Sequence, residues 1–138
     1  MVNAMKNNRY KCIILDRDGV INIKMPGSRY VLDPEQLNFI PGSIEAMIEI
    51  QRSSKLAIAT NQACISKGLL THEGLAEIHN KLSNELDKQN AKIDLIKYCP
   101  HQDLDHCNCR KPKFGMLENI CNELSLDRTE VCFIGDSL

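Results

Sequence analysis

Two aspartates stand two positions apart in the segment Asp16-Arg17-Asp18-Gly19, directly after a short apolar run. Paired carboxylates at the end of a buried strand can act as a nucleophile and a proton carrier, and Gly19 permits a sharp backbone turn. A solvated surface turn is the alternative explanation for such a pair taken alone. The pair therefore needs support from other segments of the chain.

Three further segments offer phosphate or metal chemistry. The hydroxyl and amides of Thr60-Asn61-Gln62 can hold a phosphoryl oxygen, and the cations of Arg110-Lys111 suit phosphate charge. Asp136 adds a third carboxylate for a hard divalent cation. Taken singly, each has an ordinary explanation as turn, basic loop or helix cap.

Two Cys/His pairs with metal-ligand spacing follow one another: Cys99-Pro100-His101 and, five residues later, Cys107-Asn108-Cys109. Three thiolates and one imidazole form the tetrahedral ligand set of a structural zinc ion. Bystander cysteines in a loop are the alternative. A closed set of four ligands leaves no position for water, so we expect zinc to fix the loop beside Arg110 and Lys111 rather than to react.

Short apolar runs bounded by turn residues predict four buried parallel strands, at residues 11–16, 56–60, 93–99 and 131–135. Helical spacing between them predicts three helices, with Ser43 capping the first and Thr71 the second. The second shows Leu75, Ile78, Leu82 and Leu86 on one face, and we expect His72 and His79 on its surface. The third shows Met116, Leu117, Ile120, Cys121 and Leu124.

This alternation predicts an α/β fold with a doubly wound, Rossmann-like parallel sheet, which places its chemistry at the carboxyl ends of the strands. The chain has 138 residues, 43% of them hydrophobic, which is enough for one domain, residues 1–138. The formal net charge of −1 gives no overall attraction to nucleic acid or acidic lipid. No apolar stretch approaches the roughly 20 residues of a membrane span, and the amino terminus lacks the apolar core of a secretion signal.

The cysteine pattern indicates a reducing, cytoplasmic compartment. Seven cysteines are an odd number, and three of them crowd between positions 99 and 109, as in metal ligation. We expect the other four, Cys12, Cys64, Cys121 and Cys132, to be small buried hydrophobes or bystanders.

Taken together and in order, DRDGVIN, TNQ, CRKP and IGDS resemble the haloacid dehalogenase superfamily across residues 11–138. The segment with the predicted zinc ligands, residues 99–109, is called the zinc loop below. This loop and the R-K-P element resemble the branch that contains the D-glycero-D-manno-heptose 1,7-bisphosphate 7-phosphatases and the histidinol-phosphate phosphatases. The segments RYVLDPEQLNFIPGSIEAM, NQACISKG and KPKFGML favour the heptose group. Phe114 departs from that group, which usually has proline there.

The resemblance implies a magnesium-dependent phosphatase acting on a small phosphorylated substrate, which we expect to be a sugar bisphosphate. Asp16 would attack phosphorus to form an aspartyl-phosphate, and Asp18 would act as acid and base. Magnesium would be bound by Asp16, Asp136 and the backbone carbonyl of Asp18. The predicted phosphate-binding residues are Thr60, Asn61, Gln62, Arg110 and Lys111.

The lengths of the intervening segments leave no room for a separate cap domain. Substrate selection would then fall to residues 21–35, residues 63–70 and the zinc loop. Relatives in the resembled family continue past the G-D-S element with another aspartate, a helix and a strand, so we expect this chain to be incomplete and weakly active or inactive. A monomer is expected; a dimer through the exposed edge strand 131–135 stays open, as does a catalytically silent, zinc-stabilised binding protein.

Overall fold

A four-stranded parallel sheet forms the centre of the computed structural model, which describes residues 10–27 and 29–136. Its strands are β1 (Cys12–Leu15), β2 (Lys55–Asn61), β3 (Leu95–Cys99) and β4 (Val131–Ile134), in the spatial order β3-β2-β1-β4. In register, Ile13 of β1 lies beside Leu56 of β2 and Cys132 of β4. All four predicted strands are confirmed.

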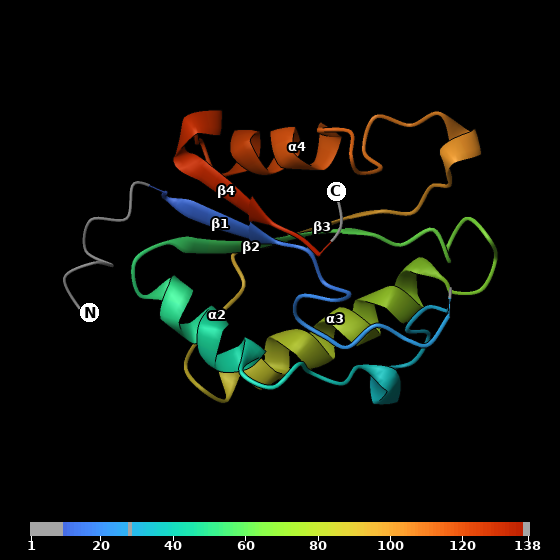
Figure 1. The fold of residues 1–138 in the computed structure, drawn as a ribbon, viewed down its shortest axis with the longest axis horizontal. Helices are drawn as coiled ribbons and strands as arrows, with labels where there is room; N and C mark the ends of the chain where they lie inside the picture. The colour runs from blue at the N-terminus through green and yellow to red at the C-terminus, as the bar shows by residue number, and fades with distance from the viewer. Residues whose placement is uncertain (1–9, 28, 137–138) are drawn as a thin grey trace.

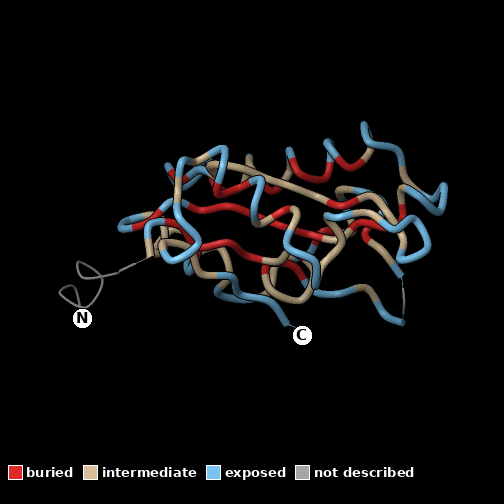
Figure 2. The backbone as a smooth tube through the Cα atoms, turned by 90° about the horizontal axis from the view of Figure 1, so that it is seen from above, coloured by how far each residue is buried: buried red, intermediate tan, exposed pale blue. Residues whose placement is uncertain are grey.

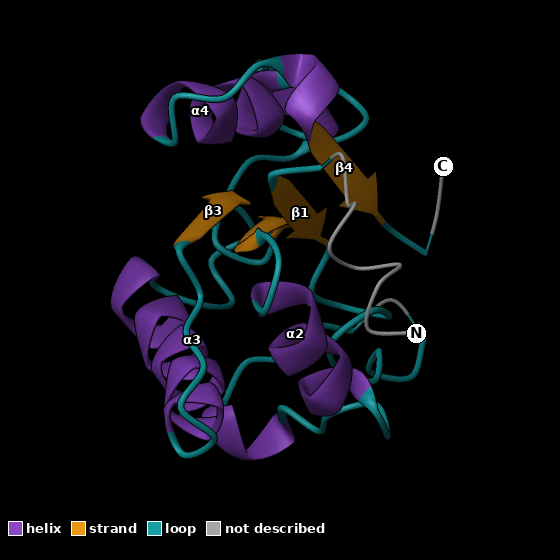
Figure 3. Ribbon diagram, turned by 90° about the vertical axis from the view of Figure 1, so that its left-hand side faces the viewer, coloured by secondary structure: helices purple, strands orange, loops and turns teal. Residues whose placement is uncertain are grey.

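Helices cover both faces of the sheet (Figure 1). Helices α2 (Ser43–Gln51) and α3 (His72–Asp87) lie on one face, and α4 (Gly115–Glu123) lies on the other, as the side view also shows (Figure 3). Three short 3-10 helices, Pro34–Gln36, Asp103–Asp105 and Arg128–Glu130, lie in the connections. The predicted doubly wound α/β architecture is confirmed.

The two central strands, β1 and β2, are buried on both faces, and the buried segments run through the middle of the molecule (Figure 2). Because successive side chains of a strand point to opposite faces, Ile13 and Leu15 join the core beneath α2 and α3, whereas Cys12 and Ile14 join the core beneath α4. Each fully buried aliphatic side chain contributes roughly 1.5–3 kcal/mol of transfer free energy. The two cores together fix the edge where the strands end.

The two predicted helix caps have different outcomes. Thr71 caps α3, because its Oγ1 accepts a hydrogen bond from the Gly74 amide at 3.0 Å. The prediction for Ser43 is wrong: Ser43 is the first residue of α2, and its buried hydroxyl has no hydrogen-bond partner among the described residues. Gly42 takes the cap position with φ +88°, a left-handed conformation that serine rarely adopts.

Strand β4 forms one edge of the sheet, as expected from its sequence. Phe133 and Ile134 are exposed there. Association through this edge stays a prediction, as do the domain boundaries. No helix in the described part of the chain has the length and apolar character to cross a bilayer. The prediction that the amino terminus lacks a secretion signal concerns mainly residues 1–9, which lie outside the described residues.

Candidate active site

The carboxyl ends of β1, β2 and β4 meet around one cavity of about 630 Å³. Asp16 and Asp18 follow β1, Asp136 follows β4, and Asn61 ends β2; all four line the cavity, together with Lys111. Its remaining walls are formed by Lys24, Pro112, Lys113, Phe114, Leu117 and Phe133. The structure thus brings together three predicted carboxylates and the predicted lysine.

Gly19 allows the turn that follows β1 to approach Asp136 closely. Its φ is +86°, and a Cβ atom at this position would lie 2.4 Å from Asp136 Oδ2. The turn is closed by a hydrogen bond of 2.8 Å from the Gly19 amide to the Asn22 carbonyl. Only glycine fits both the backbone conformation and the contact.

Two lysines neutralise the carboxylates in the cavity. Lys111 Nζ lies 2.8 Å from Asp16 Oδ2 and 5.0 Å from the centroid of the Phe133 ring. Lys24 Nζ lies 2.5 Å from Asp136 Oδ2, and this hydrogen bond is the largest of the contributions that raise the pKa of Lys24. The cavity therefore presents alternating negative and positive groups, as a site for a metal ion and a phosphate requires.

Asp18 is held from several sides by hydrogen-bond donors. Its Oδ1 accepts from Arg17 Nε at 3.2 Å, Arg17 Nη2 at 3.0 Å and Asn22 Nδ2 at 2.9 Å. Its Oδ2 accepts from Gln62 Nε2 at 3.0 Å. Burial acts to raise the pKa of Asp18, but the Arg17 charge and these hydrogen bonds outweigh it and leave the pKa lowered. The orientation of this carboxylate is therefore fixed by the protein.

The three residues at the end of β2 have different surroundings. Asn61 lines the cavity and hydrogen bonds to the backbone of Lys111. Thr60 and Gln62 are buried, and Gln62 Nε2 donates to Thr60 Oγ1 at 3.0 Å as well as to Asp18. The buried Gln62 side chain thus helps to hold the Asp18 carboxylate in place. Direct phosphate contacts by these three residues stay a prediction.

The Arg110 side chain is directed toward the zinc loop. Its Nε lies 2.8 Å from Asp103 Oδ1, and its Nη1 donates to the His101 carbonyl at 3.3 Å. Arg110 is not among the residues that line the cavity, unlike the neighbouring Lys111. Its predicted contact with phosphate would require the guanidinium to leave this pairing.

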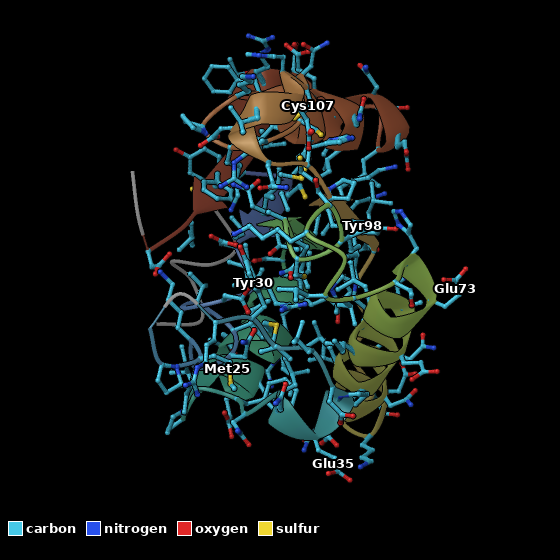
Figure 4. All side chains as sticks on the ribbon, turned by 90° about the vertical axis from the view of Figure 1, so that its right-hand side faces the viewer. Met25, Tyr30, Glu35, Glu73, Tyr98 and Cys107 are labelled. Atoms are coloured by element: carbon cyan, nitrogen blue, oxygen red, sulfur yellow. The ribbon has the colours of Figure 1, made fainter. Side chains whose placement is uncertain are left out.

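The predicted zinc ligands Cys99, His101, Cys107 and Cys109 form one cluster, with all four ligand atoms within 4.8 Å of one another. Cys99 Sγ lies 3.6 Å from Cys107 Sγ and 3.5 Å from His101 Nδ1. Although burial acts to raise it, the backbone amides of Arg110 and Cys109 contribute to lowering the pKa of the Cys107 thiol to about 6. A donor set of three sulfurs and one imidazole at this separation fits zinc. Figure 4 shows Cys107 well apart from Glu35, on the α4 side of the sheet.

The zinc loop is joined to two neighbouring segments. At α4, the Gly115 amide donates to the Asn108 carbonyl at 3.0 Å, and a Cβ on Gly115 would lie 2.3 Å from that oxygen. On the other side, Ser66 Oγ donates to Asp105 Oδ2 and accepts from Gln102 Nε2, both at 3.0 Å. The loop therefore connects the segment after β2 with the start of α4.

The segments expected to select the substrate contribute unequally to the cavity. Residues 21–35 contribute Lys24, whereas no residue of the zinc loop, residues 99–109, lines the cavity; Lys113 and Phe114 lie four and five positions after its last ligand. Residues 63–70, all of them described, do not line it. Phe114 is exposed and forms part of the wall at the position where the resembled family usually has proline.

His79 is a residue that the sequence interpretation misplaced. The prediction of a surface position is wrong, because His79 is only 8% exposed and its Nε2 lies 3.2 Å from Nη1 of the buried Arg17. Burial, followed by the Arg17 charge, lowers the pKa of His79 to about 4. Its spacing from Leu75 and Leu82 places it on the buried face, and this signal was available in the sequence. His72 is exposed as predicted, and its Nδ1 lies 2.8 Å from the Tyr98 hydroxyl.

The fold and these side chains define a phosphatase of the haloacid dehalogenase type. The sequence model of the polynucleotide kinase 3 phosphatase family matches residues 11–138, and the chain belongs to this family. It is 39% identical to the D-glycero-beta-D-manno-heptose-1,7-bisphosphate 7-phosphatase of Neisseria meningitidis serogroup A over 129 residues, which cover 93% of this chain and 68% of that relative. It is 41% identical to the D-glycero-alpha-D-manno-heptose-1,7-bisphosphate 7-phosphatase of Campylobacter jejuni, over 93% of this chain and 72% of the relative.

A solved structure supports the same assignment. The D,D-heptose 1,7-bisphosphate phosphatase of B. bronchiseptica, complexed with magnesium and phosphate, superimposes with a TM-score of 0.87 and 37% sequence identity. The match covers 93% of this chain and 71% of that structure. The resemblance inferred from the sequence motifs is confirmed.

Proposed function

We propose that this chain is a magnesium-dependent phosphatase that removes the 7-phosphate of D-glycero-D-manno-heptose 1,7-bisphosphate through an aspartyl-phosphate. The observation that carries the proposal is the convergence of Asp16, Asp18, Asp136 and Lys111 on one cavity. The names of the curated relatives support this substrate.

In the first half of the reaction, an Asp16 carboxylate oxygen forms a bond to phosphorus as the bond to the sugar oxygen breaks. Asp18, whose lowered pKa means that it must first take up a proton, gives this proton to that leaving oxygen. In the second half, water attacks the phosphorus of the aspartyl-phosphate and gives a proton to Asp18, and the Asp16 carboxylate is regenerated. Two neighbouring carboxylates thus take different roles because they have different partners.

The carboxylates of Asp16 and Asp136 and the backbone carbonyl of Asp18 would hold magnesium, because hard oxygen ligands are what this ion prefers. The bound ion supplies positive charge that reduces repulsion between the Asp16 carboxylate and phosphate. Lys111, beside Asp16, would hold the transferring phosphoryl group. The fit rests on the chemistry of the donors that line the cavity.

The cavity walls suit a phosphorylated sugar. Phe114, Leu117 and Phe133 form an apolar surface, and Lys24 and Lys113 add positive charge. An apolar wall with a few charged groups can take a sugar ring and a second phosphate. We propose a cytoplasmic location, because a cluster of thiolate ligands persists in a reducing compartment.

Phosphate release from a panel of substrates tests the proposal. The panel contains both anomers of the heptose bisphosphate, histidinol phosphate and a 3′-phosphorylated oligonucleotide, each with and without magnesium. We expect magnesium-dependent release, fastest from a heptose bisphosphate. A preference for histidinol phosphate or the oligonucleotide would replace the proposed substrate and leave the reaction class unchanged.

The nucleophile is tested by Asp16→Asn, which should reduce turnover on the order of 100-fold or more while the protein stays folded. Asp87→Asn, at an exposed position on α3, is the matched control. If the wild-type protein released no phosphate from any substrate, the alternative of a zinc-stabilised binding protein would be favoured. Wild-type turnover in folded Asp16→Asn would show that the nucleophile assignment is wrong.

A further inference from the structure

A fully buried arginine, Arg17, hydrogen bonds to Asp18, the predicted acid/base. The Arg17 side chain is 0% exposed, although it carries a charge and stands between Asp16 and Asp18 in the sequence. Guanidinium has five N–H donors and no acceptor, so every polar partner of Arg17 must accept a hydrogen bond. Within residues 10–27 and 29–136, its side-chain partners are Asp18 Oδ1, contacted by Nε and Nη2, and His79 Nε2, contacted by Nη1.

This geometry determines the protonation of the His79 ring. Because Arg17 can only donate, His79 Nε2 must carry the lone pair, and the proton of the neutral ring is then on Nδ1. Helix α3 positions the ring: Leu75 and Leu82, on the same face, are fully buried beneath the sheet. The ring also lies against Tyr98, with ring centroids 6.2 Å apart.

We propose that His79 is a positioning residue for the phosphatase reaction, which accepts a hydrogen bond from Arg17 and thereby holds the guanidinium that orients the Asp18 carboxylate. This inference rests on the proposed function, in which Asp18 donates and accepts protons. His79 would therefore act on the cavity through Arg17 and Asp18, without touching the substrate itself. A buried donor without a partner is costly, so removal of the acceptor should shift Arg17 and with it Asp18.

A histidine that only filled the core would behave differently. Its replacement would lower stability, but it would not distinguish substrates that need protonation of the leaving oxygen from those that do not. An alkyl phosphate such as a sugar phosphate needs that proton, whereas the p-nitrophenolate of p-nitrophenyl phosphate leaves without it. Hydrolysis of the aspartyl-phosphate also uses Asp18 and is common to both substrates, so the two are compared by kcat/KM, which covers only the steps up to loss of the leaving group. The ratio of the two kcat/KM values therefore reports on Asp18 as an acid.

The experiment compares His79→Leu, which lacks an acceptor, with His79→Gln, whose side-chain oxygen can accept from Arg17. We expect His79→Leu to lower kcat/KM on the heptose bisphosphate by about 10- to 100-fold, with a much smaller loss on p-nitrophenyl phosphate. We expect His79→Gln to recover most of the activity. In an Asp18→Asn background, His79→Leu should have little further effect, because both changes act on one proton transfer.

Asn80→Ala, at an exposed position of the same helix, is the control. Unchanged kcat/KM on the heptose bisphosphate in folded His79→Leu, or equal losses of kcat/KM on both substrates, would overturn the proposal. A second measurement does not depend on activity: nitrogen NMR of the ring at neutral pH should show a protonated Nδ1. A proton on Nε2 would contradict the hydrogen bond from Arg17. If the wild-type protein hydrolysed neither substrate, the proposed function would fail and the NMR result alone would decide on the contact with Arg17.

Discussion

The side chain of Asn61 holds both polar groups of the Lys111 backbone. Its Oδ1 accepts from the Lys111 amide at 2.9 Å, and its Nδ2 donates to the Lys111 carbonyl at 3.2 Å. The pair joins the end of β2 to the segment that follows the zinc loop, 50 positions further along the chain. The ammonium beside Asp16 is therefore positioned by β2 as well as by the zinc loop.

Replacement of this amide should weaken phosphate binding. Asn61→Ala removes both hydrogen bonds, each worth about 0.5–1.5 kcal/mol net, so we expect kcat/KM to fall roughly 10-fold. Asn61→Asp keeps the acceptor and loses the donor, and it should also lose activity. Asn84→Ala, on the exposed side of α3, is the control. Steady-state kinetics at saturating magnesium measure the effect, and an unchanged kcat/KM in Asn61→Ala would contradict it.

Gly19 and Gly27 form a matched pair of glycines. Both have positive φ, +86° and +69°. A Cβ on Gly19 would meet Asp136 Oδ2 at 2.4 Å, whereas a Cβ on Gly27 would meet no atom of the described residues within 4 Å. Alanine at either position costs about 1–2 kcal/mol of backbone strain. We expect only Gly19→Ala to displace Asp136 and to raise the magnesium concentration needed for half-maximal activity, by roughly 10-fold or more.

The magnesium titration of phosphate release measures this difference. Equal magnesium requirements in the two alanine variants would show that the contact between Gly19 and Asp136 is unimportant for the metal site. Urea denaturation of both variants separates the common loss of stability from the effect on the site.

The predicted zinc site should affect both the metal content and the thermal stability of the protein. We expect about one zinc ion per chain in protein purified without chelator. Cys107→Ser should lower the zinc content and reduce Tm by roughly 5 °C or more, because binding of the metal is coupled to folding of the loop. Cys132→Ser changes a cysteine outside the cluster and serves as control. Metal analysis of the wild-type protein without zinc would refute the assignment.

The buried imidazole predicts a pH dependence of stability. The pKa of His79 is lowered from 6.5 to about 4, so between these values the unfolded state binds more protons than the folded state. The free energy of unfolding should therefore fall as the pH decreases from 6.5 to 4, by about 3 kcal/mol for this group. Well below pH 4 the ring is protonated in the folded state as well, so the loss of stability from His79 is then complete.

Urea denaturation at several pH values tests this slope. His79→Gln removes the titrating ring and should flatten the curve between pH 4 and 6.5. The same slope in the wild-type protein and His79→Gln would show that other groups cause the acid sensitivity.

The sheet and its reactive edge could be predicted because they depend on local patterns. Each strand is a short apolar run, and parallel strands end at one edge, so the residues after β1 and β4 had to meet. The zinc ligands could be predicted because Cys99 and Cys109 belong to closely spaced pairs in one loop. Comparison with known proteins then confirmed the family.

The contacts that orient the site could not be predicted in the same way. Arg17 and His79 are 62 positions apart, and their contact depends on how α3 packs beneath β1. The direction of Arg110 is likewise set by Asp103, which lies on a 3-10 helix within the zinc loop. Ser43 failed as a cap because serine and glycine both occupy such positions, and the left-handed turn at Gly42 decided between them.

The hydrogen bonds of Ser66 with Gln102 and Asp105 make two loops interdependent. Residues 63–70 do not reach the cavity themselves, so an exchange in that loop acts on it through the zinc loop. A chimaera that takes residues 63–70 from another phosphatase of the family would need the donor's residues at 102 and 105 as well. The two loops are therefore one module for specificity engineering, to be transplanted together.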